Sequence, residues 1–222
     1  MSRIIDGKAI SAAVKERIRG EVSALSARGV TVGLAVIIVG ENPASKIYVA
    51  NKKKACEALG IVSEEYALPE STTEQELLEL INTLNNKKSI NGILCQLPLP
   101  PHLDEKLIIN SIAPEKDVDA FNPYSVGRIM IGDYDFVPCT PAGIMEMLKY
   151  EGIEIAGKNC VVIGRSNIVG KPMAMLLLHA NGTVTVCHSK TKNLKEICRN
   201  ADILVAAVGK AKFVTGDMVK PG

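Results

Sequence analysis

The sequence of 222 residues contains no tryptophan, only three phenylalanines and five tyrosines. Surfaces that bind single-stranded nucleic acid commonly stack bases on aromatic side chains, so this scarcity argues against such a surface. Basic and acidic residues also nearly balance, 26 against 24, which leaves a formal charge of +2. A strongly basic patch is the usual electrostatic footprint of a nucleic-acid or anionic-membrane partner. We therefore expect neither nucleic acid nor a membrane as a partner.

The N-terminus has no signal-peptide apolar region, and no apolar run is long enough to span a bilayer. Six cysteines are scattered along the chain without a CxxC pair, and most of them lie in apolar runs. This distribution is typical of reduced, buried thiols in a cytoplasmic protein. The three histidines show no metal-ligand spacing with the cysteines or with acids, so we expect no metal site.

Hydrophobic residues make up 47% of the chain, and strand-like apolar runs alternate with helix-like periodic segments. Residues 33–39 (GLAVIIV) form a continuous apolar run that suits a strand buried on both faces. Thr73 and Glu76 offer a capping box at the start of a helix. This order favours an α/β fold with a parallel, doubly wound sheet. The expected helices lie at 8–27, from the break at 40–43 to about 59, in the segment that begins after Thr73, and at 104–112. The expected strands lie at 33–39, 62–67 and 90–95.

Residues 113–137 are less regular and rich in turn residues, so we place a domain boundary there. The predicted division is a first domain at 1–120, a linker region at 121–137 and a second domain at 138–222. Thr140 is expected to cap a helix that has Pro141 in its first turn. The elements expected after it are strands at 160–163, 183–187 and 203–208, and helices at 168–180 and 193–200.

The strand at 160–163 runs into the segment 164–170 (GRSNIVG), and a helix follows. A glycine turn at a helix N-terminus offers N–H groups and a positive dipole end to a diphosphate. It is not a true GxGxxG, so an ordinary strand–helix turn is the alternative. The next strand ends in residues 188–190 (HSK), without the acid that NAD-type sites place there. A hydroxyl and a cation, with Arg165 nearby, favour NADP over NAD, unless this segment is only a solvated turn.

Tyr48 and Lys52 lie four residues apart on one expected helix, so their side chains are neighbours. The rest of that row is apolar, which makes Lys52 a lone cation; a snorkelling surface lysine is the alternative. Gln96 follows an expected strand, and ligands of open α/β sheets bind at the carboxyl ends of strands. Asp119 lies in the irregular stretch, where a solvated turn acid is the alternative.

These residues belong to an ordered set of motifs that runs through the chain. The motifs are G-x3-AS-x2-YV-x2-K-x-K-x5-GI from Gly40, QLPLP from Gln96, PEKDVD from Pro114, PCTPAG from Pro138 and GRSNIVGKP from Gly164. The set closely resembles the bifunctional methylenetetrahydrofolate dehydrogenase/methenyltetrahydrofolate cyclohydrolase family. Because several motifs match in order, the resemblance is far more specific than a glycine turn alone.

The resemblance implies an N-terminal parallel α/β catalytic domain and a C-terminal Rossmann-type NADP-binding domain. It implies oxidation of 5,10-methylenetetrahydrofolate with NADP, followed by hydrolysis of the methenyl product to 10-formyltetrahydrofolate. In that reading Tyr48 lies against the folate, Lys52 is the central catalytic group, Gln96 orients Lys52, and Asp119 binds the amide edge of the pterin. The residues implied to bind NADP are Gly164, Arg165, Ser166 and Ser189. The implied partners are a tetrahydrofolate derivative and a second copy of the chain, in the cytoplasm.

Two departures from the family pattern qualify these expectations. Ala120 follows Asp119 where the family usually has glycine, and a positive φ there would risk displacing Asp119. An open Rossmann-type sheet normally continues past three strands, so we expect the chain to be C-terminally incomplete. A protein that ends at Gly222 is then predicted to be poorly soluble or to bind NADP weakly.

Two alternatives stay open at this level. A shikimate dehydrogenase-like enzyme would explain the fold and NADP, but not the QLPLP and KDVD segments. A non-catalytic or monofunctional relative that binds folate or NADP would differ in turnover of methylenetetrahydrofolate.

Overall fold

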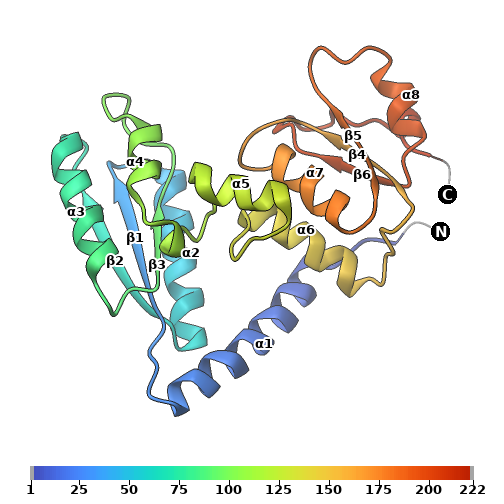
Figure 1. Ribbon diagram of the computed structural model, residues 1–222. Coiled ribbons are helices and arrows are strands. Elements are labelled where there is room, and N and C mark those ends of the chain that lie inside the picture. Colours follow the sequence, from blue (N-terminus) through green and yellow to red (C-terminus); the bar gives the residue numbers. More distant parts are fainter. Residues whose placement is uncertain (1–2, 221–222) are drawn as a thin grey trace. The chain divides into compact units, whose positions relative to one another are not determined.

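The computed structural model describes residues 3–220 and divides them between two compact units. The first unit is Ser11–Tyr124, and the second unit consists of the described residues from Ser125 onward together with those before Ser11. Residues 221–222, at the end of the chain that we expect to be C-terminally incomplete, lie outside the described residues. Figure 1 labels the elements of both units.

The first unit is built on a parallel sheet in the order β2-β1-β3. The central strand is buried almost throughout, as its uninterrupted apolar sequence requires in a sheet covered on both faces. The strands are β1 (Gly33–Val39), β2 (Val62–Leu68) and β3 (Gly92–Cys95); the helices are α1 (Gly7–Ala27), which enters from the second unit, α2 (Pro43–Leu59), α3 (Glu74–Asn86), α4 (Glu105–Ser111) and the 3-10 turn η1 (Pro114–Lys116).

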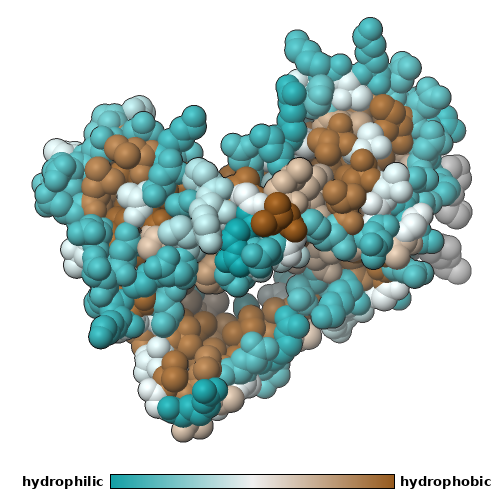
Figure 2. Space-filling model, viewed as in Figure 1, coloured by the Kyte–Doolittle hydropathy of each residue, from teal (hydrophilic) through white to brown (hydrophobic). Residues whose placement is uncertain are grey.

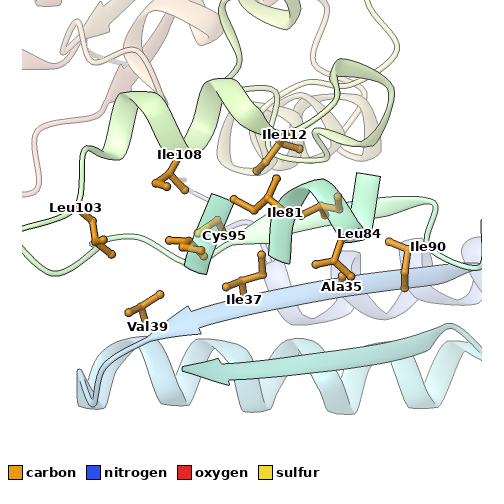
Figure 3. Packing of buried hydrophobic residues seen from close by; sticks show 12 residues of the cluster. Ala35, Ile37, Val39, Ile81, Leu84, Ile90, Cys95, Leu103, Ile108 and Ile112 are labelled. Carbon is orange, nitrogen blue, oxygen red and sulfur yellow. The ribbon is translucent and has the colours of Figure 1, made fainter. Parts of the chain in front are cut away.

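Helices cover both faces of this sheet. On one face, Ile81 and Leu84 of α3 and Ile108 of α4 point at Ile37 and its neighbours on β1, as Figure 3 shows. On the other face, Val49 of α2 packs in a separate cluster with residues of β1 and β3. Burying one such side chain contributes roughly 1.5–3 kcal/mol. The two clusters therefore hold α2 and the strand ends in fixed register.

Local signals set the ends of the helices in the first unit. The side chain of Asn42 caps α2 by accepting a hydrogen bond of 3.1 Å from the N–H of Ser45. Gly60 ends α2 at a φ of 77°, a conformation that glycine adopts without steric cost. The predicted capping box of Thr73 and Glu76 at the start of α3 is confirmed.

The second unit contains a parallel sheet in the order β5-β4-β6. Its largest cluster places Leu148 of α6 and Met173 and Leu177 of α7 against Val162 of β4. The strands are β4 (Asn159–Ile163), β5 (Thr183–Cys187) and β6 (Ile203–Ala206); the helices are α5 (Pro123–Ile131), α6 (Cys139–Tyr150), α7 (Gly170–His179), α8 (Leu194–Arg199) and the 3-10 turn η2 (Gly216–Met218).

The α/β class and the parallel order of both sheets confirm the sequence-based prediction. One local prediction was wrong: α6 begins at Cys139, with Pro138 at the capping position, and Thr140 lies inside the helix. The reason is that the N–H of Ala142 already donates to the carbonyl of Pro138, so the helix begins two residues earlier than expected. The stretch 113–137, expected to be irregular, contains α5, whose residues from Ser125 belong to the second unit. The domain limits at residues 120 and 138, expected from the sequence, stay a prediction.

Within the described part of the chain, no helix combines the length and the apolar character that crossing a membrane requires. Figure 2 shows hydrophilic residues over much of the visible face, with hydrophobic patches between them.

Candidate functional site

The carboxyl ends of β1 and β3 form the switch point of the first sheet. The chain leaves β1 through α2 to reach β2 on one side, whereas β3 lies on the other side of β1. Adjacent strands whose connections diverge in this way open a crevice at their carboxyl ends, where open α/β sheets bind ligands. Gln96 lies at this edge, and its N–H continues the ladder with a 2.8 Å hydrogen bond to the carbonyl of Ile37.

Lys52 and Gln96 meet at this edge. The Nζ of Lys52 donates a hydrogen bond of 2.8 Å to Oε1 of Gln96. The amide nitrogen of Gln96 donates in turn to the carbonyl of Leu97, also at 2.8 Å, which fixes the orientation of the amide. Lys53 and Lys54 are exposed, whereas Lys52 is half-buried. Lys52 is thus held by a partner across the switch point, unlike a freely solvated surface lysine.

Asp119 shares the electrostatic field of this pair. Burial raises the pKa of Asp119 from 3.8 to about 6; the charge of Lys52 opposes this rise, and the carboxylate of Asp117 adds to it. Burial also raises the pKa of the neighbouring Cys95 thiol to about 12, with the charge of Asp119 adding to the effect. The Cys95 thiol therefore stays protonated, while Asp119 titrates close to neutral pH.

A buried clamp that the sequence did not reveal holds the loop of Asp119. Asp117 is 2% exposed, and its Oδ2 accepts a 2.8 Å hydrogen bond from the N–H of Asn122. The side chain of Asn122, also buried, donates to the carbonyl of Ile112 at 3.2 Å. The loop is therefore closed at both ends, and Asp119 lies between them.

Ala120, which follows Asp119 where the family usually has glycine, has a positive φ. Its φ is +54°, in the left-handed region, and its side chain is fully buried. For a residue with a Cβ this region costs roughly 1–2 kcal/mol. The N–H of Ala120 donates to the carbonyl of Asp117 at 3.1 Å, so the turn keeps its hydrogen bond with alanine in place of glycine.

Tyr48 lies one turn before Lys52 on α2, and its side chain is 61% exposed. Its ring is therefore accessible from solvent, on the same row of α2 as Lys52. The switch point thus combines an accessible aromatic ring, a cation held by an amide, and a carboxylate that titrates near neutrality.

The glycine turn of the second unit requires close backbone approach. Gly164 has a φ of +126°, and a Cβ added there would lie 2.4 Å from the carbonyl oxygen of Ala207. A Cβ added to Gly170 would lie 2.2 Å from the carbonyl oxygen of Gly164. Neither position accepts a side chain without a shift of the backbone. A turn of this kind at the start of a helix is the geometry that receives a dinucleotide diphosphate.

Ser166 has a structural role that the sequence did not show. Its Oγ accepts hydrogen bonds from the N–H groups of Val169, at 3.2 Å, and Gly170, at 3.3 Å. Both groups lie at the start of α7, where unpaired N–H groups need an acceptor. The hydroxyl hydrogen of Ser166 is not used in these two bonds, so it can still be donated to a ligand.

Arg165 and Ser189 follow the ends of two neighbouring strands. Ile163 of β4 pairs with Cys187 of β5, and the N–H of Gly164 donates to the carbonyl of Cys187 at 2.8 Å. Each of the two residues follows its paired strand end by two positions, and both are exposed. A guanidinium and a hydroxyl at neighbouring strand ends, without an acid after β5, fit a 2′-phosphate better than free ribose hydroxyls.

Each of the two α/β units is built on a parallel sheet. One unit carries a dinucleotide-type glycine turn, and the other carries the cluster of Lys52, Gln96 and Asp119. Together they define the class of dinucleotide-dependent enzymes. The sequence matches the family described as tetrahydrofolate dehydrogenase/cyclohydrolase, catalytic domain, over residues 5–119. It matches the NAD(P)-binding domain of the same family over residues 138–222. The chain belongs to this family, which excludes the shikimate dehydrogenase-like alternative.

Individual relatives agree with this assignment. The bifunctional protein FolD of Acetivibrio thermocellus is 59% identical over 221 residues, which cover 100% of this chain and 78% of that protein. The bifunctional FolD structure from Campylobacter jejuni is 50% identical with a TM-score of 0.96, covering 99% of this chain and 78% of that one. The Trypanosoma brucei FolD structure, solved with NADP and an inhibitor, is 39% identical with a TM-score of 0.94. The match covers 100% of this chain and 76% of that one.

Proposed function

We propose that this chain oxidises 5,10-methylenetetrahydrofolate to the methenyl compound with NADP and hydrolyses that product to 10-formyltetrahydrofolate. The observation that carries the proposal is the hydrogen bond between Lys52 and Gln96 at the switch point, close to the half-buried carboxyl group of Asp119. Membership of the dehydrogenase/cyclohydrolase family supplies the reaction class.

The residues of the second unit fit NADP. Gly164 and Gly170 let the backbone of the turn pack closely at the start of α7, and Arg165 and Ser189 carry the donors for a 2′-phosphate. When bound, NADP accepts the hydride that leaves the methylene carbon of the substrate. The task of the protein in this step is alignment, and the exposed ring of Tyr48 would lie against the folate.

Hydrolysis of the methenyl compound requires proton transfer by the protein. Water adds to the methenyl carbon, and the bond from that carbon to one of its two nitrogens breaks. One proton of the water ends on the released nitrogen, and the other leaves. In this proposal Lys52 relays these protons, and its hydrogen bond to Gln96 holds the ammonium group in place. The carboxylate of Asp119 would accept hydrogen bonds from the N–H groups at the amide edge of the pterin.

Separate assays of the two steps test this proposal. Purified protein is given methylenetetrahydrofolate with NADP or with NAD, and NADPH or NADH formation is followed. In a second assay the disappearance of methenyltetrahydrofolate is followed without any dinucleotide. We expect turnover in both assays, and faster oxidation with NADP than with NAD. Binding without turnover would support a non-catalytic relative, and turnover in one assay alone would support a monofunctional one.

The family also suggests the setting in which the chain works. We propose a homodimer formed through the second domain, and a cytoplasmic enzyme whose folate domain is 1–120 and whose NADP domain is 138–222. Light scattering on the purified protein tests the first point, because a monomeric mass at micromolar concentration would contradict it.

A further inference from the structure

The turn that follows β5 is organised around one residue, His188. The backbone N–H of His188 donates to Oγ1 of Thr191 at 2.8 Å, and its carbonyl accepts from the N–H of Thr191, also at 2.8 Å. The ring Nδ1 of His188 accepts a third hydrogen bond, of 3.2 Å, from the N–H of Lys190. Three hydrogen bonds thus close the turn formed by residues 188–191. Ser189 lies inside this turn, directly after His188.

The third contact depends on the chemistry of the ring. A backbone N–H can only donate, so Nδ1 of His188 must be an unprotonated acceptor in this contact. An apolar side chain of similar size would leave the N–H of Lys190 without this partner. Asparagine differs, because its Oδ1 stands as far along the side chain as Nδ1 and can also accept.

The turn matters because Ser189 is exposed and follows β5, the strand that pairs with β4, after which Arg165 lies. A donor on a loose turn must be ordered when a ligand binds, and the lost conformational entropy weakens binding. A donor on a closed turn avoids most of that loss. Only a ligand that reaches Ser189 gains from the closure.

We propose that His188 is a positioning residue for cofactor specificity: its Nδ1 closes the turn that presents Ser189 to the 2′-phosphate of NADP. This inference rests on the proposed function. It predicts that replacing His188 weakens binding of NADP and changes binding of NAD little, because NAD has no 2′-phosphate. A purely structural residue would affect both cofactors alike.

Calorimetric titration with adenosine 2′,5′-bisphosphate, and with adenosine 5′-phosphate for comparison, tests the inference without turnover. We expect His188→Leu to weaken binding of the bisphosphate about tenfold and binding of the monophosphate less than twofold. His188→Asn should keep bisphosphate binding within about threefold of wild type. His102→Leu is the matched control, because His102 contacts the carbonyl of Thr72 in the first unit and should leave both affinities unchanged.

The ratio of kcat/KM for NADP to that for NAD should fall in His188→Leu and recover in His188→Asn. Equal losses for both nucleotides, or an asparagine variant as impaired as the leucine variant, would overturn the inference. If His188→Leu does not fold, Thr191→Val removes the hydroxyl that closes the other side of the turn and should give the same selective loss. If the wild type itself does not prefer the bisphosphate, the proposed NADP function fails, and not merely this inference.

Discussion

The ammonium group of Lys52 and the side-chain oxygen of Gln96 are joined by a 2.8 Å hydrogen bond across the switch point of the first sheet. Lys52 lies on the helix after β1, and Gln96 directly follows β3. The two residues are 44 positions apart in sequence, so their contact depends on the parallel pairing of these two strands.

This contact predicts that the two residues act as a unit. Hydrogen bonds to charged groups contribute about 1.5–3 kcal/mol, so Gln96→Leu should lower methenyl hydrolysis by roughly ten- to a hundredfold. The double variant with Lys52→Met should be no slower than Lys52→Met alone, because the only function of the amide in this account is to hold the lysine. Steady-state hydrolysis rates of the four proteins form the cycle, and additive losses would contradict the pairing.

A second prediction concerns the cofactor. Arg165→Ala should weaken NADP roughly tenfold or more and leave NAD nearly unchanged, because charge-assisted contacts to phosphate contribute about 1.5–3 kcal/mol. The measurement is KM for each dinucleotide. Arg199→Ala removes the same charge from an exposed position on α8 and should change neither value. Equal losses for both dinucleotides would show that Arg165 does not read the 2′-phosphate.

A third prediction follows from the raised pKa of Asp119. Burial raises it from 3.8 to about 6, so the folded state holds more protons than the unfolded state between these values. The free energy of unfolding therefore falls as pH rises from about 4 to about 6, and the loss persists above pH 6. Asp119→Asn removes this loss and should stabilise the protein at pH 8 by on the order of 1–3 kcal/mol.

Urea unfolding of wild type and Asp119→Asn at pH 4 and pH 8 measures this difference. The asparagine variant should also bind the folate substrate more weakly, because it loses the charged acceptor. A stability difference that does not change with pH would mean that Asp119 is solvated in the folded state.

Much of the fold was predictable because the strands carry strong local signals. An apolar run such as 33–39 suits a strand that is covered on both faces, and the alternation of such runs with helical segments indicates a parallel sheet. The place of Gln96 was predictable for a related reason, since parallel strands bring their carboxyl ends to one edge, whereas its contact with Lys52 was implied only by the resemblance to the family.

The clamp that holds Asp119 was not predictable. Asp117 and Asn122 lie in a turn-rich segment, where buried and solvated polar residues have the same sequence signature. Their burial depends on α4 and β3 packing around them, which no local pattern encodes. The same holds for Ser166, because a serine that caps a helix and a serine that binds phosphate look alike in sequence.

The central claim is that Lys52 carries the proton transfers of hydrolysis, and Lys52→Met tests it most directly. General acid–base catalysis contributes roughly a hundred- to ten-thousandfold, so methenyl hydrolysis should fall by at least about a hundredfold. Methylene oxidation should fall less, because alignment by Tyr48, Asp119 and the cofactor site remains. Lys53→Met and Lys54→Met are the matched controls, since both lysines are exposed, and should show much smaller effects.

The deciding measurement is the rate of methenyltetrahydrofolate hydrolysis by Lys52→Met, with the oxidation rate measured on the same preparation. The account predicts a loss of hydrolysis of at least about a hundredfold that exceeds the loss of oxidation. Hydrolysis at the wild-type rate would make Lys52 a structural lysine and would contradict the assignment of the site.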